Sequence, residues 1–179
     1  HIYLIEAGPR LLAGMSEESS AHAEQFLREM GVNILLNKRV VDYRDHKVVL
    51  EDGTEIATRT FIWVSGVTGV TIGNMDPSLI GRGGRIKVDS FNRVEGMSNV
   101  FAIGDQCIQV ADEDYPNGHP QLAQVAIQQG ELLAKNLIRM EKGREMKPFH
   151  YRNLGSMATV GRNRAVAEFS KVKMQGWFA

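Results

Sequence analysis

The feature that most constrains the fold of this chain is a short apolar run that ends in glycine and aspartate. Residues 100–103 read Val-Phe-Ala-Ile, the composition of a buried strand, and Gly104 and Asp105 follow directly. Further along, an amphipathic stretch with Pro120 near its start predicts a helix over about residues 119–142. Because a buried strand followed by a helix is the repeating unit of α/β proteins, we expect parallel sheets in this chain.

The same strand-to-helix segment has the chemistry needed to hold a flavin. Gly104 has no side chain, so the backbone there can approach a polyphosphate or ribityl chain closely. The carboxylate of Asp105 can accept hydrogen bonds from ribityl hydroxyl groups. Backbone N–H groups at the start of the helix, near His119 and Pro120, would favour negative charge on one edge of a reduced flavin. We therefore predict a flavin as the cofactor.

Composition argues against several other classes of protein. The 179 residues carry no net formal charge, so the basic surface of a nucleic-acid-binding protein is not indicated. Cys107 is the single cysteine, which leaves no internal disulfide and no thiolate-rich zinc site, and we expect it to be a small buried residue. The histidines, His119 among them, lack the spacing of metal ligands, so we predict no metal and place them at the surface or as caps.

Hydrophobic periodicity and turn signals predict the remaining elements. A buried parallel strand at residues 2–6 is followed by a helix that Ser16 caps and Gly31 terminates. Glycines cluster between residues 67 and 97, which indicates a crossover between domains. Further strands are expected at residues 32–36, 39–44, 47–50, 55–58, 60–64, 85–88, 151–160 and 165–171, with an Asp52-Gly53 hairpin turn and a Gly-Arg-Asn turn at 161–163.

Three segments resemble the type II (alternative) NADH:quinone oxidoreductases. They read Phe-Ala-Ile-Gly-Asp at 101–105, Ala-Gln-Val-Ala-Ile-Gln-Gln at 123–129 and Gly-Ser-Met-Ala-Thr-Val-Gly-Arg at 155–162. The family consists of single-subunit FAD enzymes of the pyridine nucleotide-disulfide oxidoreductase superfamily. The Gly-Asp strand is common to that superfamily, whereas the Ala-Gln-x-Ala-x-Gln run is associated with its quinone-reducing branch.

The resemblance covers essentially the whole chain and implies an α/β fold. It implies parts of two Rossmann-like, glutathione-reductase-type dinucleotide-binding domains with a β-meander crossover. Residues 1–66 correspond to the C-terminal half of an NAD-binding domain, 67–146 to the returning half of the FAD-binding domain, and 147–179 to the start of a C-terminal region. The family's two glycine-rich phosphate loops have no counterpart in this sequence, so we expect a portion of a longer protein that is inactive by itself.

Site residues follow from the resemblance. Glu6 ends the first strand, where it would bind the adenosine ribose and favour NADH over NADPH, although Arg10 nearby could weaken that preference. Gly66, in the segment Trp-Val-Ser-Gly-Val at 63–67, would allow close backbone approach to the isoalloxazine. Gly104, Asp105, Ala123 and Gln124 complete the expected cofactor-binding set.

Two glutamines are the candidate catalytic residues. Gln124 and Gln128 share one helix face, and their neutral amides suit recognition of quinone carbonyl groups. Gln121 and Gln129 point elsewhere on the helix and are expected at the surface.

The implied reaction is electron transfer from NADH through FAD to a membrane quinone, on the cytoplasmic side of the membrane. The complete protein would reach the membrane surface through a C-terminal region. A homodimer is one possible assembly. One alternative is a soluble FAD-dependent NAD(P)H reductase or oxidase of the same superfamily. A sulfide:quinone oxidoreductase would need more cysteines than Cys107. A third alternative is a non-catalytic interaction domain on the same scaffold.

Overall fold

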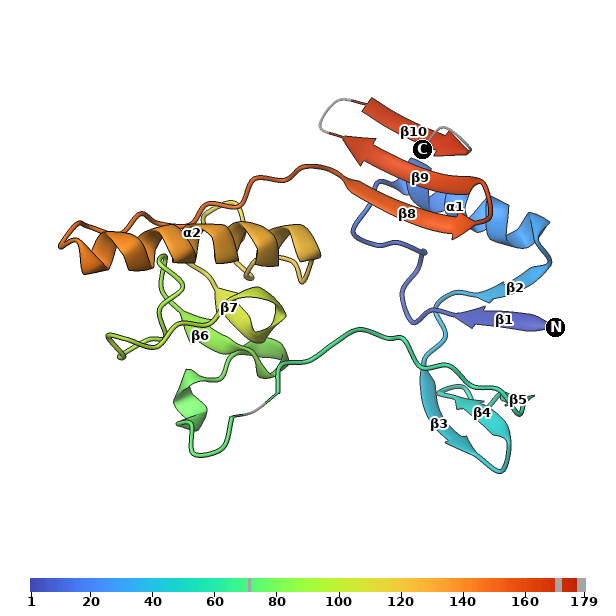
Figure 1. Ribbon diagram of the computed structural model, residues 1–179. Helices are drawn as coiled ribbons and strands as arrows, with labels where there is room; N and C mark the ends of the chain where they lie inside the picture. The colour runs from blue at the N-terminus through green and yellow to red at the C-terminus, as the bar shows by residue number, and fades with distance from the viewer. Residues whose placement is uncertain (71, 170–171, 177–179) are drawn as a thin grey trace. The chain divides into compact units, whose positions relative to one another are not determined.

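The computed structural model describes residues 1–70, 72–169 and 172–176, which form the mixed α/β structure predicted from the sequence (Figure 1). The chain divides into two compact units. Unit 1 combines residues 1–63 with the described residues from Leu154 onward, and unit 2 consists of residues 64–153.

Unit 1 begins with a β–α–β arrangement. Strand β1 (Ile2–Ile5) pairs in parallel with β2 (Val32–Leu35), and helix α1 (Glu17–Glu29) connects them. The hydroxyl of Ser16 accepts a hydrogen bond from the backbone N–H of Ser19 and so caps α1, as predicted. Gly31 follows the helix with a φ of +81°, a conformation that glycine adopts without a steric penalty.

The expectation that the first strand is fully buried is wrong. Ile2 and Tyr3 of β1 are 66% and 47% exposed. Helix α1 instead packs Ala23 and Phe26 against Val166 of the C-terminal sheet. Among the described strands β1 pairs only with β2, so its other edge lacks the neighbouring strand expected in a doubly wound sheet.

A second sheet in unit 1 is the predicted meander. It contains β3 (Val40–Arg44), β4 (Lys47–Leu50) and β5 (Glu55–Ala57), all antiparallel, with the predicted turn at Asp52-Gly53.

The strand predicted at residues 60–64 is not formed. Ile62, Trp63 and Val64 are 75%, 60% and 82% exposed. The ring of Phe61 stacks on Tyr43 instead, with their centroids 4.9 Å apart. A β-branched apolar run becomes a strand only beside a partner that pairs with its backbone, and no described strand pairs with this one.

The C-terminal sheet contains β8 (Ser156–Gly161), β9 (Arg164–Phe169) and β10 (Val172–Gly176) in antiparallel order (Figure 1). The antiparallel pair joined at residues 161–163 is therefore confirmed, but β8 begins at Ser156 rather than at residue 151. The last two residues of the predicted second strand, 170 and 171, lie outside the described residues. Strand β10 was not predicted.

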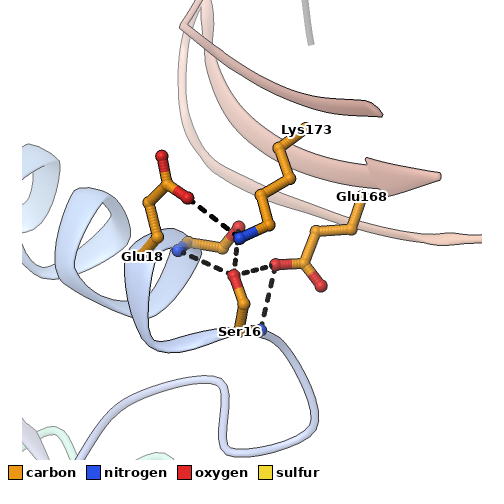
Figure 2. Close-up of polar contacts among 5 residues, drawn as sticks. Ser16, Glu18, Glu168 and Lys173 are labelled. Carbon is orange, nitrogen blue, oxygen red and sulfur yellow. Dashed lines mark hydrogen bonds and ion pairs between the residues drawn. The ribbon is translucent and has the colours of Figure 1, made fainter. Parts of the chain in front are cut away.

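A polar network joins this sheet to the start of α1 (Figure 2). Glu168 of β9 accepts hydrogen bonds from the hydroxyl of Ser16 and, at 2.9 Å, from its backbone N–H. Lys173 of β10 pairs with Glu18 at 2.9 Å. The hydrogen bonds from Ser16 lower the pKa of Glu168, and its carboxylate also lies where the α1 dipole favours negative charge.

Unit 2 contains the parallel strands β6 (Ile86–Val88) and β7 (Cys107–Gln109), helix α2 (Ala123–Glu141), and three short 3₁₀ turns, η1 (Pro77–Leu79), η2 (Arg82–Gly84) and η3 (Gly104–Gln106). Its core is formed by Ile86, Val88, Val94 and Cys107. Within the described residues, no helix combines the length and hydrophobicity needed to cross a bilayer.

Two expected boundaries in unit 2 are wrong. Residues 100–103 form one isolated bridge, between Phe101 and Arg93, and the strand β7 starts only after η3. Helix α2 begins at Ala123 rather than near His119. The side chain of His119 is buried and hydrogen-bonded to Asp112. The chain before α2 is therefore held in a non-helical path.

Candidate cofactor site

The Gly-Asp turn lies against helix α2. Gly104 has a φ of +65°, and its N–H donates to Oε1 of Gln129 at 2.6 Å. A Cβ at Gly104 would lie 3.2 Å from Cβ of Ala126, so the close approach seen here is to the helix. The next residue, Asp105, is exposed. The turn therefore presents a carboxylate at the surface from a backbone that α2 holds.

The N-terminus of α2 adjoins this turn. The Nε2 amide of Gln121, just before the helix, donates to the carbonyl of Asp105 at 3.2 Å. The N-cap residue is Leu122, whose apolar side chain provides no hydrogen bond to the first turn. Ala123 and Gln124 are thus the first residues of a 19-residue helix, where its dipole is positive. A surface carboxylate beside a helix N-terminus fits the hydroxyl and negative-edge chemistry of a flavin.

The crossover segment is joined to the same turn. The side chain of Gln106 accepts from Val70 N–H at 3.0 Å and donates to Val70 carbonyl at 2.6 Å. This two-point contact holds Val70, four residues after Gly66, beside η3. Gly66 is exposed, with a φ of +96°, and nothing lies within 4 Å of the position a Cβ would take.

The two candidate catalytic glutamines lie one helical turn apart. Gln124 is half-buried in the first turn of α2. The side-chain amide of Gln128 donates to the carbonyl of Arg152 at 2.9 Å and accepts from its N–H at 3.0 Å. Gln128 therefore anchors the chain after α2 in addition to any contact with a substrate.

Gln129 is not at the surface as expected, because its side chain is only 1% exposed. With Val125 and Asn136 it forms the buried stripe of α2. The sequence held a signal for this position, since residues 125, 129 and 136 recur with helical periodicity on one face. A polar residue in such a stripe indicates a buried hydrogen bond.

His119 is also buried, and the expectation of a surface or capping histidine is wrong. It is 2% exposed, and its Nε2 lies 3.1 Å from Oδ2 of Asp112. The rings of Tyr115, Phe149 and Tyr151 surround it, with centroids 5.1, 5.2 and 6.0 Å away. Burial acts to raise the pKa of Asp112, but its hydrogen bond to His119 and others hold the pKa below the usual value.

Cys107 is a buried thiol of unit 2. Cys107 is 1% exposed, as predicted, and burial raises the pKa of its thiol. Over the described ranges, no three His, Cys, Asp or Glu side chains gather as metal ligands would.

Glu6 lies in unit 1, directly after β1. Its Oε1 accepts a hydrogen bond from Gly8 N–H at 2.6 Å, so the carboxylate is directed over the loop that follows the strand. Arg10 donates to the carbonyls of Ala13 and Met15, both at 2.8 Å. The arginine that could weaken nucleotide discrimination is thus engaged with its own loop.

A family model and the similar curated proteins point to the same family. Residues 1–130 match the family described as pyridine nucleotide-disulphide oxidoreductase. The type II NADH:quinone oxidoreductase NdhA of Mycobacterium tuberculosis (strain ATCC 25618 / H37Rv) is 35% identical over 99% of this chain and 39% of its own length. A type II NADH:quinone oxidoreductase of Staphylococcus aureus (strain NCTC 8325 / PS 47) is 33% identical over 92% of this chain and 41% of its own.

Solved structures show the same fold. NDH2 from Plasmodium falciparum in complex with NADH has a TM-score of 0.84 at 19% identity, covering 98% of this chain and 51% of that one. The sulfide:quinone oxidoreductase of Aquifex aeolicus has a TM-score of 0.73 at 16% identity, covering 99% and 46%. The chain thus spans about half or less of the length of these relatives.

Proposed function

Because this chain belongs to the pyridine nucleotide-disulphide oxidoreductase family, we propose that the complete protein carries electrons from NADH through FAD to a membrane quinone. The observation that carries the proposal is the Ala-Gln-Val-Ala-Ile-Gln-Gln run at the start of α2, which lies against the Gly104–Asp105 turn. Since quinones reside in lipid, the complete protein would work at a membrane surface.

The chain's own residues would bind and orient the flavin, which when bound accepts a hydride and passes electrons on. Asp105 would accept hydrogen bonds from ribityl hydroxyls. The first turn of α2, at Ala123 and Gln124, would stabilise negative charge on the flavin edge. Gly66, four residues before the Val70 that Gln106 holds, would let the backbone approach the ring system. We assign residues 67–146 to this function.

Residues 1–66 would bind NADH, and residues 147–179 would begin the C-terminal region. Glu6 is the residue that would select NADH. It lies at the carboxyl end of a parallel strand, where dinucleotide-binding domains place an acidic residue against the ribose hydroxyls. The same carboxylate would repel the 2′-phosphate of NADPH.

Replacing Glu6 by glutamine in the complete protein is expected to narrow the preference for NADH over NADPH by roughly tenfold, a loss of about 1.4 kcal/mol of discrimination. Glutamine keeps an acceptor for Gly8 N–H but removes the charge that repels the 2′-phosphate. The measurement is the ratio of kcat/KM for the two nucleotides, with Glu51→Gln, an exposed acid on the meander, as the control. Equal kcat/KM values in the unmodified protein would contradict the assignment.

The quinone step is tested by separating the two half-reactions in a stopped-flow instrument. Gln124→Ala is expected to slow flavin oxidation by a quinone about tenfold, the effect of one lost hydrogen bond, while flavin reduction by NADH stays unchanged. Gln128→Ala is expected to act in the same direction.

Because Gln128 also anchors Arg152, it needs a matched control. Asn136 makes the same two-point contact with the backbone of Lys147, at 2.8 Å for both bonds, farther along α2. If Gln128→Ala behaves like Asn136→Ala, Gln128 is only an anchor. If neither glutamine variant alters the quinone step, a soluble FAD-dependent reductase becomes the better description.

A further inference from the structure

We propose that Gln129 is a positioning residue for FAD: its buried carbonyl oxygen holds the Gly104 N–H and thereby sets the orientation of Asp105. This inference rests on the proposed function, because it assigns a role within the same flavin site. The expected quinone and flavin contacts involve Gln124 and Gln128, and Gln129 faces away from both into the core.

The contact between Gln129 and the turn is short, and the Gln129 side chain is buried. Oε1 of Gln129 accepts the Gly104 N–H at 2.6 Å, and the Cys107 thiol lies 3.7 Å from the same oxygen. A buried side-chain amide is costly unless it is hydrogen-bonded, so an apolar residue would otherwise be favoured in the buried stripe of α2. The hydrogen bond from the Gly104 N–H therefore explains why an amide occupies this buried position.

Gln129 holds the turn that presents Asp105. Gly104 has a positive φ, and η3 comprises only the three residues from Gly104 to Gln106. Gln129 fixes the N–H at the start of this turn, and Gln121 donates to the Asp105 carbonyl at 3.2 Å. The backbone on both sides of Asp105 is thus held by residues of or next to α2, while its side chain is exposed.

A hydrogen-bonded frame of this kind acts through preorganisation. A carboxylate that is already oriented does not have to be ordered when the ligand binds, which increases affinity without adding a contact. Loss of the Gln129 carbonyl would leave the Gly104 N–H without that acceptor and would allow the turn to rotate. Loss of this hydrogen bond should therefore weaken FAD binding and not only lower the stability of unit 2.

The test uses the complete protein and three variants. Gln129→Met keeps the length of the side chain but removes the acceptor. Gln129→Glu keeps an oxygen at the same place and should restore the contact, because burial favours the protonated carboxyl. Asn136→Leu is the matched control, since Asn136 is equally buried on α2 but bonds to Lys147, away from the turn.

The readouts are the dissociation constant for FAD, obtained by titrating the apoprotein, and the visible spectrum of the bound flavin. We expect Gln129→Met to bind FAD about tenfold more weakly and to shift the flavin bands. Gln129→Glu should stay within about twofold of the unmodified protein in affinity. Asn136→Leu should lower the melting temperature but leave affinity and spectrum unchanged.

The inference is overturned if Gln129→Met binds FAD as tightly as the unmodified protein with the same spectrum. It is also overturned if Asn136→Leu weakens FAD binding equally, because that would show a general loss of stability. If the unmodified protein binds no FAD at all, the proposed function itself fails, which is a different result.

Discussion

Replacing Asp105 with alanine in the complete protein is expected to weaken FAD binding about 10- to 100-fold. The interaction expected to be lost is a charge-assisted hydrogen bond to the ribityl chain, and such bonds contribute about 1.5–3 kcal/mol in proteins. Asp105 is exposed, so its removal should leave the core of unit 2 intact. Titration of the apoprotein with FAD measures the change, and Asp105→Asn should give an intermediate affinity because it keeps an acceptor.

The control for Asp105→Ala is Glu113→Ala. Glu113 is another exposed acid of unit 2, so the change in net charge is the same. If both variants retain stoichiometric FAD through extensive dialysis, Asp105 does not bind the cofactor. If both lose it equally, overall charge is responsible and the assignment to the ribityl chain is wrong.

Replacing Gly69 with alanine is expected to destabilise unit 2 by about 3 kcal/mol, the upper end of what overpacking costs. A Cβ at Gly69 would lie 2.3 Å from the carbonyl oxygen of Gly84 and 2.7 Å from its carbonyl carbon. Both are backbone atoms, so no flexible side chain can give way. The close approach is fixed by a hydrogen bond from Gly69 N–H to the Gly83 carbonyl at 2.8 Å.

Gly73→Ala is the matched control, because nothing lies within 4 Å of a Cβ at that position. We expect it to be neutral or slightly stabilising. Urea denaturation gives the midpoint for both variants. Indistinguishable midpoints would mean that the backbones at Gly69 and Gly84 do not cross as closely as the structure shows.

Features that depend on a few neighbouring residues were predictable. Ser16 caps the start of α1, Gly31 follows its end, and the hairpin turn lies at Asp52-Gly53. Each of these follows from side-chain capping or from a backbone conformation that only certain residues adopt easily. The family could also be predicted, because its motifs are contiguous runs at 101–105 and 123–129.

Features that depend on distant partners were not predictable. Residues 60–64 have the composition of a buried strand but have no strand partner among the described residues, and all of them except Phe61 are exposed. His119 was expected at the surface and is instead enclosed by aromatic rings and bonded to Asp112. In both cases the outcome depends on what lies next to the segment in space, which local periodicity does not report.

The candidate site also combines features that depend on neighbouring residues with features that depend on distant partners. From the sequence alone, the groups expected to bind a flavin were the Gly104–Asp105 turn and the start of the following helix, placed near His119, because glycine flexibility, carboxylate chemistry and helix dipoles are local properties. How the turn is held depends on contacts between residues far apart in the chain. Gln129 reaches Gly104 across 25 residues of chain, and Gln106 reaches Val70 across 36. A hydrogen bond needs its partners within about 3 Å, and packing alone brings residues so far apart in sequence to that distance.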